Sequence, residues 1–229
     1  VRGCVNFVVS LIKGYKYMMK SAEKQFTEEE KEESGSVMYQ ISMYVGIVLG
    51  LVLAVGLFVF LPKFLVGLMP TVKSLRILRS IVEGLVKIAI FVLYMYLISL
   101  TKDIRRQYMY HGAEHKTIAC HEAELPLTVE NVRKQTRFHK RCGTSFIFIV
   151  LFVSIFVMCF VPFTVTWQRV VASLALLPLI VGISYECIRL AGNNDNLFTK
   201  ILSAPGLAMQ RITTREPDDS MIEVAIAAL

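Results

Sequence analysis

The sequence predicts an all-α, polytopic membrane protein with about four transmembrane helices and a cytosolic, metal-binding insert. Hydrophobic residues make up 55% of the 229-residue chain and charged residues only 19%, and long stretches contain no charge. Such stretches bury their apolar surface in a lipid bilayer. The net charge of +7 comes from basic residues placed between them, a distribution typical of membrane topology. We therefore expect the bilayer as a partner and no nucleic acid.

Residues 1–36 are predicted to form an interfacial helix followed by an acidic linker. Residues 5–19 are apolar but contain Lys13 and Lys16, and about 15 residues are few for a membrane span. A helix that lies in the membrane surface fits this stretch better. Residues 26–36 (FTEEEKEESGS) have the composition of a solvated linker. No signal peptide is expected at this end.

Residues 37–100 are predicted to contain the first two transmembrane helices. Residues 37–61 carry no charge and are long enough to cross a hydrocarbon layer of about 30 Å. Residues 81–100 contain Glu83 and Lys87. Because these two side chains can pair at i,i+4 spacing near one end, a span is tolerable there as well.

Residues 145–190 are predicted to form a membrane hairpin. The spans 145–163 and 170–190 are strongly apolar and are separated by a short turn, PFTVTWQR. Tyr185 and Glu186 are polar groups near the cytosolic end of the last span, which makes them further site candidates. As an alternative, Glu186 can simply pair with a nearby arginine.

The distribution of Lys and Arg predicts the orientation of the chain. Most basic residues lie in the N-terminal segment, in the loop 101–144, or in and next to the tail 191–229. Because basic segments stay on the cytosolic side, we expect this loop and both termini in the cytosol, where cysteines stay reduced. In the tail, Pro217 in a first helical turn, with Asp218 and Asp219 behind it, predicts the start of a helix.

The residues best suited to chemistry gather in the loop 101–144, which holds all four histidines of the chain. In a helix over residues 110–122, His111 and His115 share one face, together with Glu122. Two imidazoles at this spacing can bind one metal ion. A second pair follows at i,i+3, and it offers an imidazole and a thiolate from His139 and Cys142. These are good ligands for borderline metals, so we expect a divalent metal, zinc before others.

The same stretch contains the pattern H-x-x-E-H, formed by His111, Glu114 and His115. In zinc hydrolases with this pattern the histidines hold the metal and the glutamate activates a water. Glu114 is therefore the catalytic candidate. Three alternatives remain open: interfacial polar residues without a metal, a structural zinc closed by four ligands, and a Cys142 nucleophile. In the last case His139 would be the base, and a neighbouring arginine would lower the thiol pKa.

Several motifs in a fixed order give the chain a family resemblance. They are YHGAEHKTI, LTVENVR, H-x-RCGTSF and the tail PGLAMQRITTREPDDSMIEVAIAAL. In this order they resemble the YqhQ-like family of bacterial membrane proteins, a family of unknown function labelled as predicted metal-dependent enzymes. The resemblance runs from Val1 to the last residue. In relatives a glycine-rich segment usually precedes this start, and if it completes the site we expect only part of the site here.

The resemblance implies a bacterial inner-membrane protein and a metal role for the ligand-type residues of the matched motifs: His111, His115, His139 and Cys142. Glu114 and Lys116 lie inside the same motif, and Arg141 lies beside the cysteine. His121 is left out of the ligand set because relatives are expected to have an aromatic residue there.

The predicted function is that of a metal-dependent membrane enzyme, a zinc hydrolase acting on a membrane-proximal substrate near the cytosolic face. The alternative comes from another class: a non-enzymatic membrane adaptor or scaffold whose zinc holds the loop together and whose partner is another protein. The two differ in coordination. An open metal position with Glu114 nearby favours the enzyme, and four protein ligands favour the adaptor.

Overall fold

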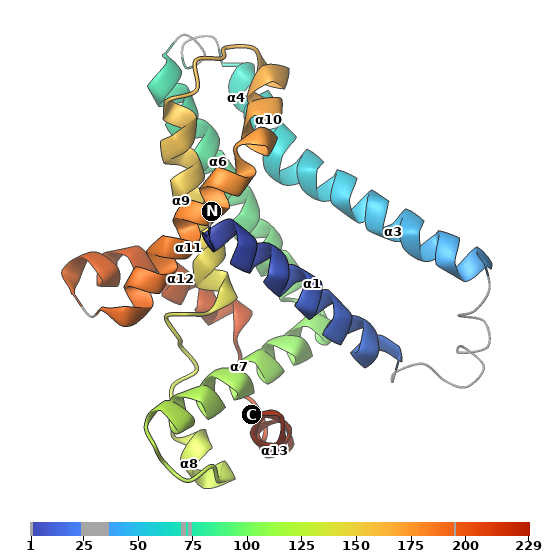
Figure 1. Ribbon diagram of the computed structural model, residues 1–229, viewed down its shortest axis with the longest axis vertical. Coiled ribbons are helices and arrows are strands. Elements are labelled where there is room, and N and C mark those ends of the chain that lie inside the picture. Colours follow the sequence, from blue (N-terminus) through green and yellow to red (C-terminus); the bar gives the residue numbers. More distant parts are fainter. Residues whose placement is uncertain (1, 24–36, 70–71, 73–74, 195) are drawn as a thin grey trace. The chain divides into compact units, whose positions relative to one another are not determined.

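The structure is a computed structural model that describes residues 2–23, 37–69, 72, 75–194 and 196–229. Within these ranges all regular elements are helices (Figure 1), which confirms the all-α prediction for the described part of the chain. The predicted acidic linker at 26–36 lies outside the described residues.

The chain divides into two compact units, each built from two distant parts of the sequence. Unit 1 consists of residues 1–87 and 155–185, and unit 2 of residues 88–154 and 186–229. The predicted insert 101–144 and the tail 191–229 thus belong to the same unit.

In unit 1, α3 (Val37–Val55) continues through a π-helical turn, η1 (Gly56–Phe60), into α4 (Leu61–Gly67). Pro62 lies at the start of α4, and because a proline has no N–H to donate into the preceding turn, a wider turn there accommodates its ring. The stretch Tyr44–Gly67 is long and apolar enough to cross a membrane.

The other predicted spans differ in how well their length and composition suit a membrane span. The helix α6 (Arg76–Ile98) is a second candidate span, whereas α9 (Gly143–Cys159) is shorter than a span. The pair α10 (Thr166–Ala175) and α11 (Leu177–Asn193) is bent by 53° and counts as one broken span at most. The described residues therefore contain two or three helices that can cross a membrane, and four spans remain a prediction.

Two local predictions need correction. The turn predicted as PFTVTWQR is shorter, because α10 already begins at Thr166, so that Trp167 and Arg169 are helical. The N-terminal helix is longer than predicted: α1 spans Arg2–Glu23. Its first turns are bonded to α11, since Cys4 donates to the carbonyl of Pro178 over 2.9 Å.

A buried ion cluster holds α6 to α10 in unit 1. Arg79, Glu83 and Arg169 are only 1%, 4% and 0% exposed. The guanidinium of Arg169 donates to both carboxylate oxygens of Glu83 over 2.9–3.1 Å, and Arg79 donates to the same carboxylate over 2.8 Å. Other N–H groups of the two guanidiniums donate to the carbonyls of Phe163 and Thr164 and to the hydroxyls of Ser80 and Thr166. From the sequence, Lys87 was expected to make Glu83 tolerable, and the role of the two arginines was not predicted.

Unit 2 is organised around α7 (Lys102–Glu122), which contains the helix predicted at 110–122. The short α8 (Val129–Arg133) and the C-terminal α13 (Asp219–Ala228) both pack against it (Figure 1). Their shared core is apolar and consists of Ala113, Cys120, Val132, Met221 and Ile222.

The tail contains one helix more than predicted. The helix α12 (Leu197–Thr213) begins with a capping box, in which the side chain of Asn196 accepts from the backbone of Thr199 and the side chain of Thr199 bonds back. The predicted final helix is present as α13, but its N-cap is Asp218, whose side chain accepts from the backbone N–H of Met221. Pro217 therefore precedes the cap and does not lie in the first turn.

We predict that Glu83→Gln strongly destabilises the protein, because it leaves two buried arginines without their counter-charge. Removing one partner from a buried ion cluster costs about 3–5 kcal/mol. The free energy of unfolding in detergent micelles measures this. The control is Arg76→Gln, which removes an exposed charge from the same helix and should change stability little. Equal stability of the Glu83 variant and the wild type would contradict the structural role of the cluster.

Candidate functional site

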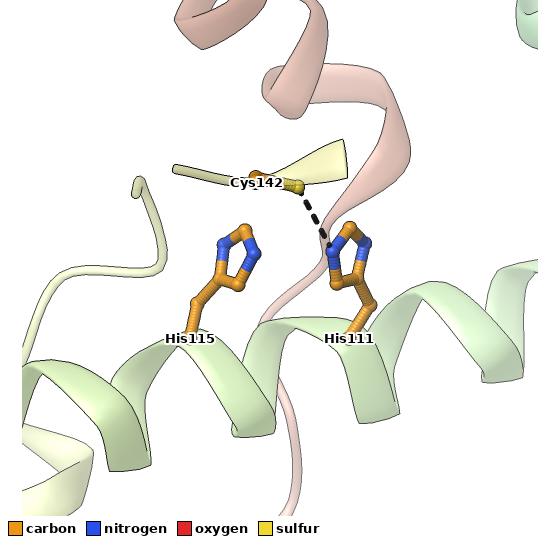
Figure 2. A group of neighbouring side chains, drawn as sticks. All are labelled: His111, His115 and Cys142. Atoms are coloured by element: carbon orange, nitrogen blue, oxygen red, sulfur yellow. Dashed lines mark hydrogen bonds between the residues drawn. The ribbon is translucent and has the colours of Figure 1, made fainter. Parts of the chain in front are cut away.

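Two imidazoles and one thiol meet on one face of α7 in unit 2. His111 and His115 lie one helical turn apart, and their ring centroids are 4.4 Å from each other. Figure 2 shows both rings pointing from α7 toward Cys142, which directly precedes α9. One possible ligand atom of each of these three side chains lies within 4.8 Å of the other two. The structure thus brings together three of the four predicted metal ligands.

Backbone carbonyls fix the orientation of both imidazoles. The Nδ1 of His111 lies 2.8 Å from the carbonyl oxygen of Thr213, and the Nδ1 of His115 lies 2.7 Å from that of Arg137. Because a carbonyl oxygen can only accept, each Nδ1 carries a proton and donates it. Metal-binding histidines are commonly held in this way, with the second nitrogen facing the ion.

Cys142 is placed to act as a thiolate. Its side chain is buried, and its Sγ lies 3.3 Å from Nε2 of His111. Burial raises the pKa of this thiol, but hydrogen bonds from His111, His115 and Thr144 outweigh it and lower the pKa from 9.0 to about 5. The bond to Cys142 in turn raises the pKa of His111, against the effect of burial. At neutral pH the sulfur is therefore ionised, which is the form that binds metals.

Gln210 holds the segment that carries Cys142. Its amide nitrogen donates to the carbonyl of His139 over 2.8 Å, and its amide oxygen accepts from the backbone N–H of the same residue, also over 2.8 Å. The nitrogen donates further to Ser145 over 3.1 Å. Because Gln210 is completely buried, these bonds hold the backbone of His139 before the cysteine and the hydroxyl of Ser145 after it.

The segment of the tail between α12 and α13 crosses directly over α7. We call residues 213–218 the tail strap. The backbone N–H of Arg215 donates to the carbonyl of Tyr108 over 2.8 Å, and a Cβ on Gly112 would lie only 2.0 Å from the carbonyl oxygen of Arg215. A residue without a side chain is thus required at position 112. This crossing brings the carbonyl of Thr213 to His111.

Ion pairs hold the tail strap in place. Glu216 accepts from Lys116 over 3.0 Å and from Arg137 over 3.2 Å. The buried Lys116 also donates to the carbonyl of Arg133 over 3.0 Å, and Arg137 donates to Thr214. Lys116, predicted as a site candidate from the family motif, therefore ties α7 to the strap and to the end of α8.

The structure does not bring His139 and Glu114 into the cluster of ligand atoms. The Nε2 of His139 lies 3.3–3.4 Å from the carboxylate of Glu122, and its ring centroid is 5.9 Å from that of His115. Glu114 is exposed and lines a pocket between α7 and α13. It acts on the cluster electrostatically, since its charge contributes to the raised pKa of His111.

The remaining candidates have structural contacts. Arg141 donates to the carbonyl of Gly192 over 3.0 Å, and Glu186 pairs with Arg189 at 3.5 Å. Tyr185 belongs to unit 1, where its hydroxyl accepts from Asn6 over 3.0 Å.

Sequence reasoning missed several residues that support the cluster. Thr213 and Arg137 act through backbone carbonyls, which have no side-chain signature. The tail motif ITTREPDD was interpreted as part of the family resemblance and as the start of a helix, whereas it contains the whole tail strap as well as the cap of α13.

In the part of the chain that the structure describes, every regular element is a helix, two or three helices are apolar and long enough to cross a membrane, and one unit carries a His–His–Cys cluster. These features are typical of the class of helical membrane proteins. The family described as protein of unknown function (DUF1385) matches residues 1–229, so the chain belongs to that family. It is 41% identical over 207 residues to the uncharacterized protein YqhQ of Bacillus subtilis (strain 168). The match covers 90% of this chain and 65% of the relative. No solved structure matches the chain. The resemblance found in the motifs is thereby confirmed.

We predict that Gly112→Ala disturbs the candidate site, because the added methyl group displaces the tail strap and with it the carbonyl that orients His111. Overpacking of this kind costs about 1–3 kcal/mol. The free energy of unfolding should fall accordingly, and the rate at which a maleimide labels the buried Cys142 should rise. Gly50→Ala is the control, since a Cβ there meets nothing within 4 Å. Unchanged labelling and stability in the Gly112 variant would show that the strap does not press on α7.

Proposed function

We propose that the protein is a metal-dependent enzyme of the bacterial cell membrane and that His111, His115 and Cys142 bind one zinc ion. The arrangement of the donor atoms carries this proposal. The three possible ligand atoms lie within 4.8 Å of one another, and the ligands of a tetrahedral zinc ion are about 3.3–3.8 Å apart. Only a small contraction of the cluster would bring the three donor atoms to the separations of a zinc site. Two imidazoles and a thiolate favour zinc over magnesium or calcium, which prefer oxygen ligands.

The number of donors favours an enzyme over a structural site. Structural zinc sites have four protein ligands, whereas catalytic sites have three and an open position. The fourth predicted ligand, His139, is bonded to Glu122 instead. Zinc bound by three residues supplies a Lewis acid that can lower the pKa of a water molecule to about 7. The adaptor alternative requires that His139 leave Glu122 and complete the coordination.

The position of the cluster supports a membrane-proximal substrate. Cys142 directly precedes the apolar helix α9, and the polar α7 begins four residues after the candidate span α6 ends. A site between such elements lies near a membrane surface. The excess of Lys and Arg in 101–144 and in the termini supports the cytosolic surface. The reducing cytosol would also keep Cys142 available as a ligand.

We predict that the insert is labelled only from the cytosol. Ala123→Cys introduces a thiol at an exposed position just after α7. In a background without the other accessible cysteines, a membrane-impermeant maleimide should label it in inverted vesicles and not in intact cells. Labelling of intact cells would reverse the orientation and remove the argument for a reduced Cys142.

We predict that the purified wild-type protein contains about one zinc ion per chain. His115→Ala and Cys142→Ala should each lose most of it, because two remaining ligands bind zinc weakly. The metal content measured by mass spectrometry tests this. His121→Ala is the matched control, since His121 is an exposed residue of the same helix. His139→Ala should retain zinc if the site has three ligands and lose it if the site has four. Full retention in both ligand variants would exclude the metal site.

We predict that Glu114→Gln keeps the metal but loses function, because the amide preserves the shape of the side chain and cannot accept a proton. The variant should retain its zinc and fail to complement a strain that lacks the protein. Glu130→Gln, an exposed glutamate on α8, is the control and should complement. If Glu114→Gln complements fully while the ligand variants do not, Glu114 is not the base, and the structural-zinc adaptor becomes the better proposal.

A further inference from the structure

The helix α1 in unit 1 carries basic and apolar side chains on different faces. With about 100° of rotation per residue, Lys13, Lys16 and Lys20 lie within about 60° of one another around the helix axis. On the other side, four apolar residues lie within about 100° of one another: Leu11, Ile12, Tyr15 and Met19. The second half of α1 is therefore amphipathic, and the lysines are the only charged residues between positions 10 and 20.

Both the apolar face and the lysines of α1 are exposed. Leu11 and Ile12 are 56% and 65% exposed, and Lys13, Lys16 and Lys20 are exposed as well. Among the side chains that the structure describes, no carboxylate pairs with these three lysines. An uncovered apolar face beside a row of cations indicates a partner that is both apolar and negatively charged.

The first turns of α1 are held against α11. A Cβ on Gly3 would lie 2.9 Å from the carbonyl oxygen of Gly182, so the two helices approach each other closely at this glycine. The side-chain amide of Asn6 donates to the hydroxyl of Tyr185 over 3.0 Å, in addition to the bond that Cys4 donates to α11. These contacts fix where α1 leaves α11.

The lysines lie beyond this contact, toward the end of α1. At about 1.5 Å per residue, Lys13 is about 10 Å along the helix from Asn6. Along α11, Tyr185 is also about 10 Å from Gly192, where the bent candidate span ends. The first lysine and the end of the span thus lie at similar distances from the bond between Asn6 and Tyr185, which allows the lysines to lie at the depth of the lipid headgroups.

A bilayer with anionic headgroups matches both faces of α1. An amphipathic helix lies in the membrane surface with its apolar face at the boundary of the acyl chains, and lysines extend their stems from there toward the headgroups. Anionic headgroups attract such lysines. A protein partner would need an apolar groove with acidic edges, whereas the candidate span that includes α11 brings a bilayer next to α1. The observations thus favour lipid over protein as the partner.

We propose that α1 binds anionic phospholipids through Lys13, Lys16 and Lys20, while its apolar face lies among the acyl chains. The sequence alone predicted only that this stretch lies in the membrane surface. The arrangement of the exposed lysines on one face, opposite an exposed apolar face, adds the class of lipid. The helix thereby collects anionic lipids around the protein. This proposal does not depend on the metal site.

Tryptophan fluorescence of the full chain in liposomes tests the orientation of α1. Trp167→Phe removes the one natural tryptophan. In this background Leu11→Trp places an indole on the apolar face, and Ser10→Trp places it on the lysine face, one residue away. Lipids with brominated acyl chains should quench Leu11→Trp about threefold more strongly than Ser10→Trp, because only the apolar face reaches the acyl chains. Equal quenching of the two would overturn the proposed orientation.

The same Leu11→Trp protein tests the choice of lipid. In equal mixtures of phosphatidylglycerol and phosphatidylcholine, the bromine is carried by one lipid or by the other. Brominated phosphatidylglycerol should quench about twofold more strongly, because anionic lipids gather around the lysines. The ratio of the two should fall to about one in Lys13→Gln/Lys16→Gln/Lys20→Gln, and also in about 1 M salt, where the screening length is about 3 Å.

A charge-preserving variant is the matched control. Lys13→Arg/Lys16→Arg/Lys20→Arg keeps the three cations and should keep the preference for phosphatidylglycerol. A ratio of about one with all three lysines present, or a ratio that the glutamine variant retains, would overturn the proposal. Weak quenching at both tryptophan positions by either lipid would assign the apolar face to a protein surface, such as a second copy of the chain, and would overturn it as well.

Discussion

The crossing of the tail strap over α7 at Gly112 is the contact on which the candidate site depends. Because residue 112 has no side chain, the carbonyl of Arg215 can lie where a Cβ would otherwise be. Backbone can approach backbone this closely only at glycine. The crossing places the carbonyl of Thr213 beside His111 and brings Glu216 to its two basic partners. A contact that involves no reactive group thus determines how the reactive groups face one another.

The sequence predicted the parts of the site that depend on local geometry. His111 and His115 share a helix face because of the helical repeat, and Cys142 was found by its chemistry and its place in the same loop. The position of His139 could not be predicted in this way. Its spacing from Cys142 suits a ligand, but its partner in the structure is Glu122, 17 residues away. Such a choice between two partners depends on tertiary packing, which one sequence does not reveal.

In the apolar part of the chain, too, local features could be predicted and features that depend on tertiary packing could not. Composition predicts where apolar helices lie, and α3 and α6 were found for that reason. It does not predict whether a helix continues: α10 and α11 meet at a 53° bend. Composition also marked Glu83 as a weak point of the second span. In the structure Arg79 and Arg169 pair with this carboxylate, and nearby carbonyls and hydroxyls accept from their other N–H groups. Buried charge is tolerated where its hydrogen bonds are satisfied.

The bonds around Cys142 also bear on the choice between an enzyme and an adaptor. A structural zinc ion stabilises a loop that the protein would otherwise leave loose. Here the segment that carries the cysteine is already held by the buried Gln210, and Glu216 joins Lys116 to Arg137 across the tail strap. These protein contacts already hold the segment before Cys142 and the tail strap without a metal ion. A thiolate and two oriented imidazoles on such a rigid frame favour a chemical role for the ion they would bind.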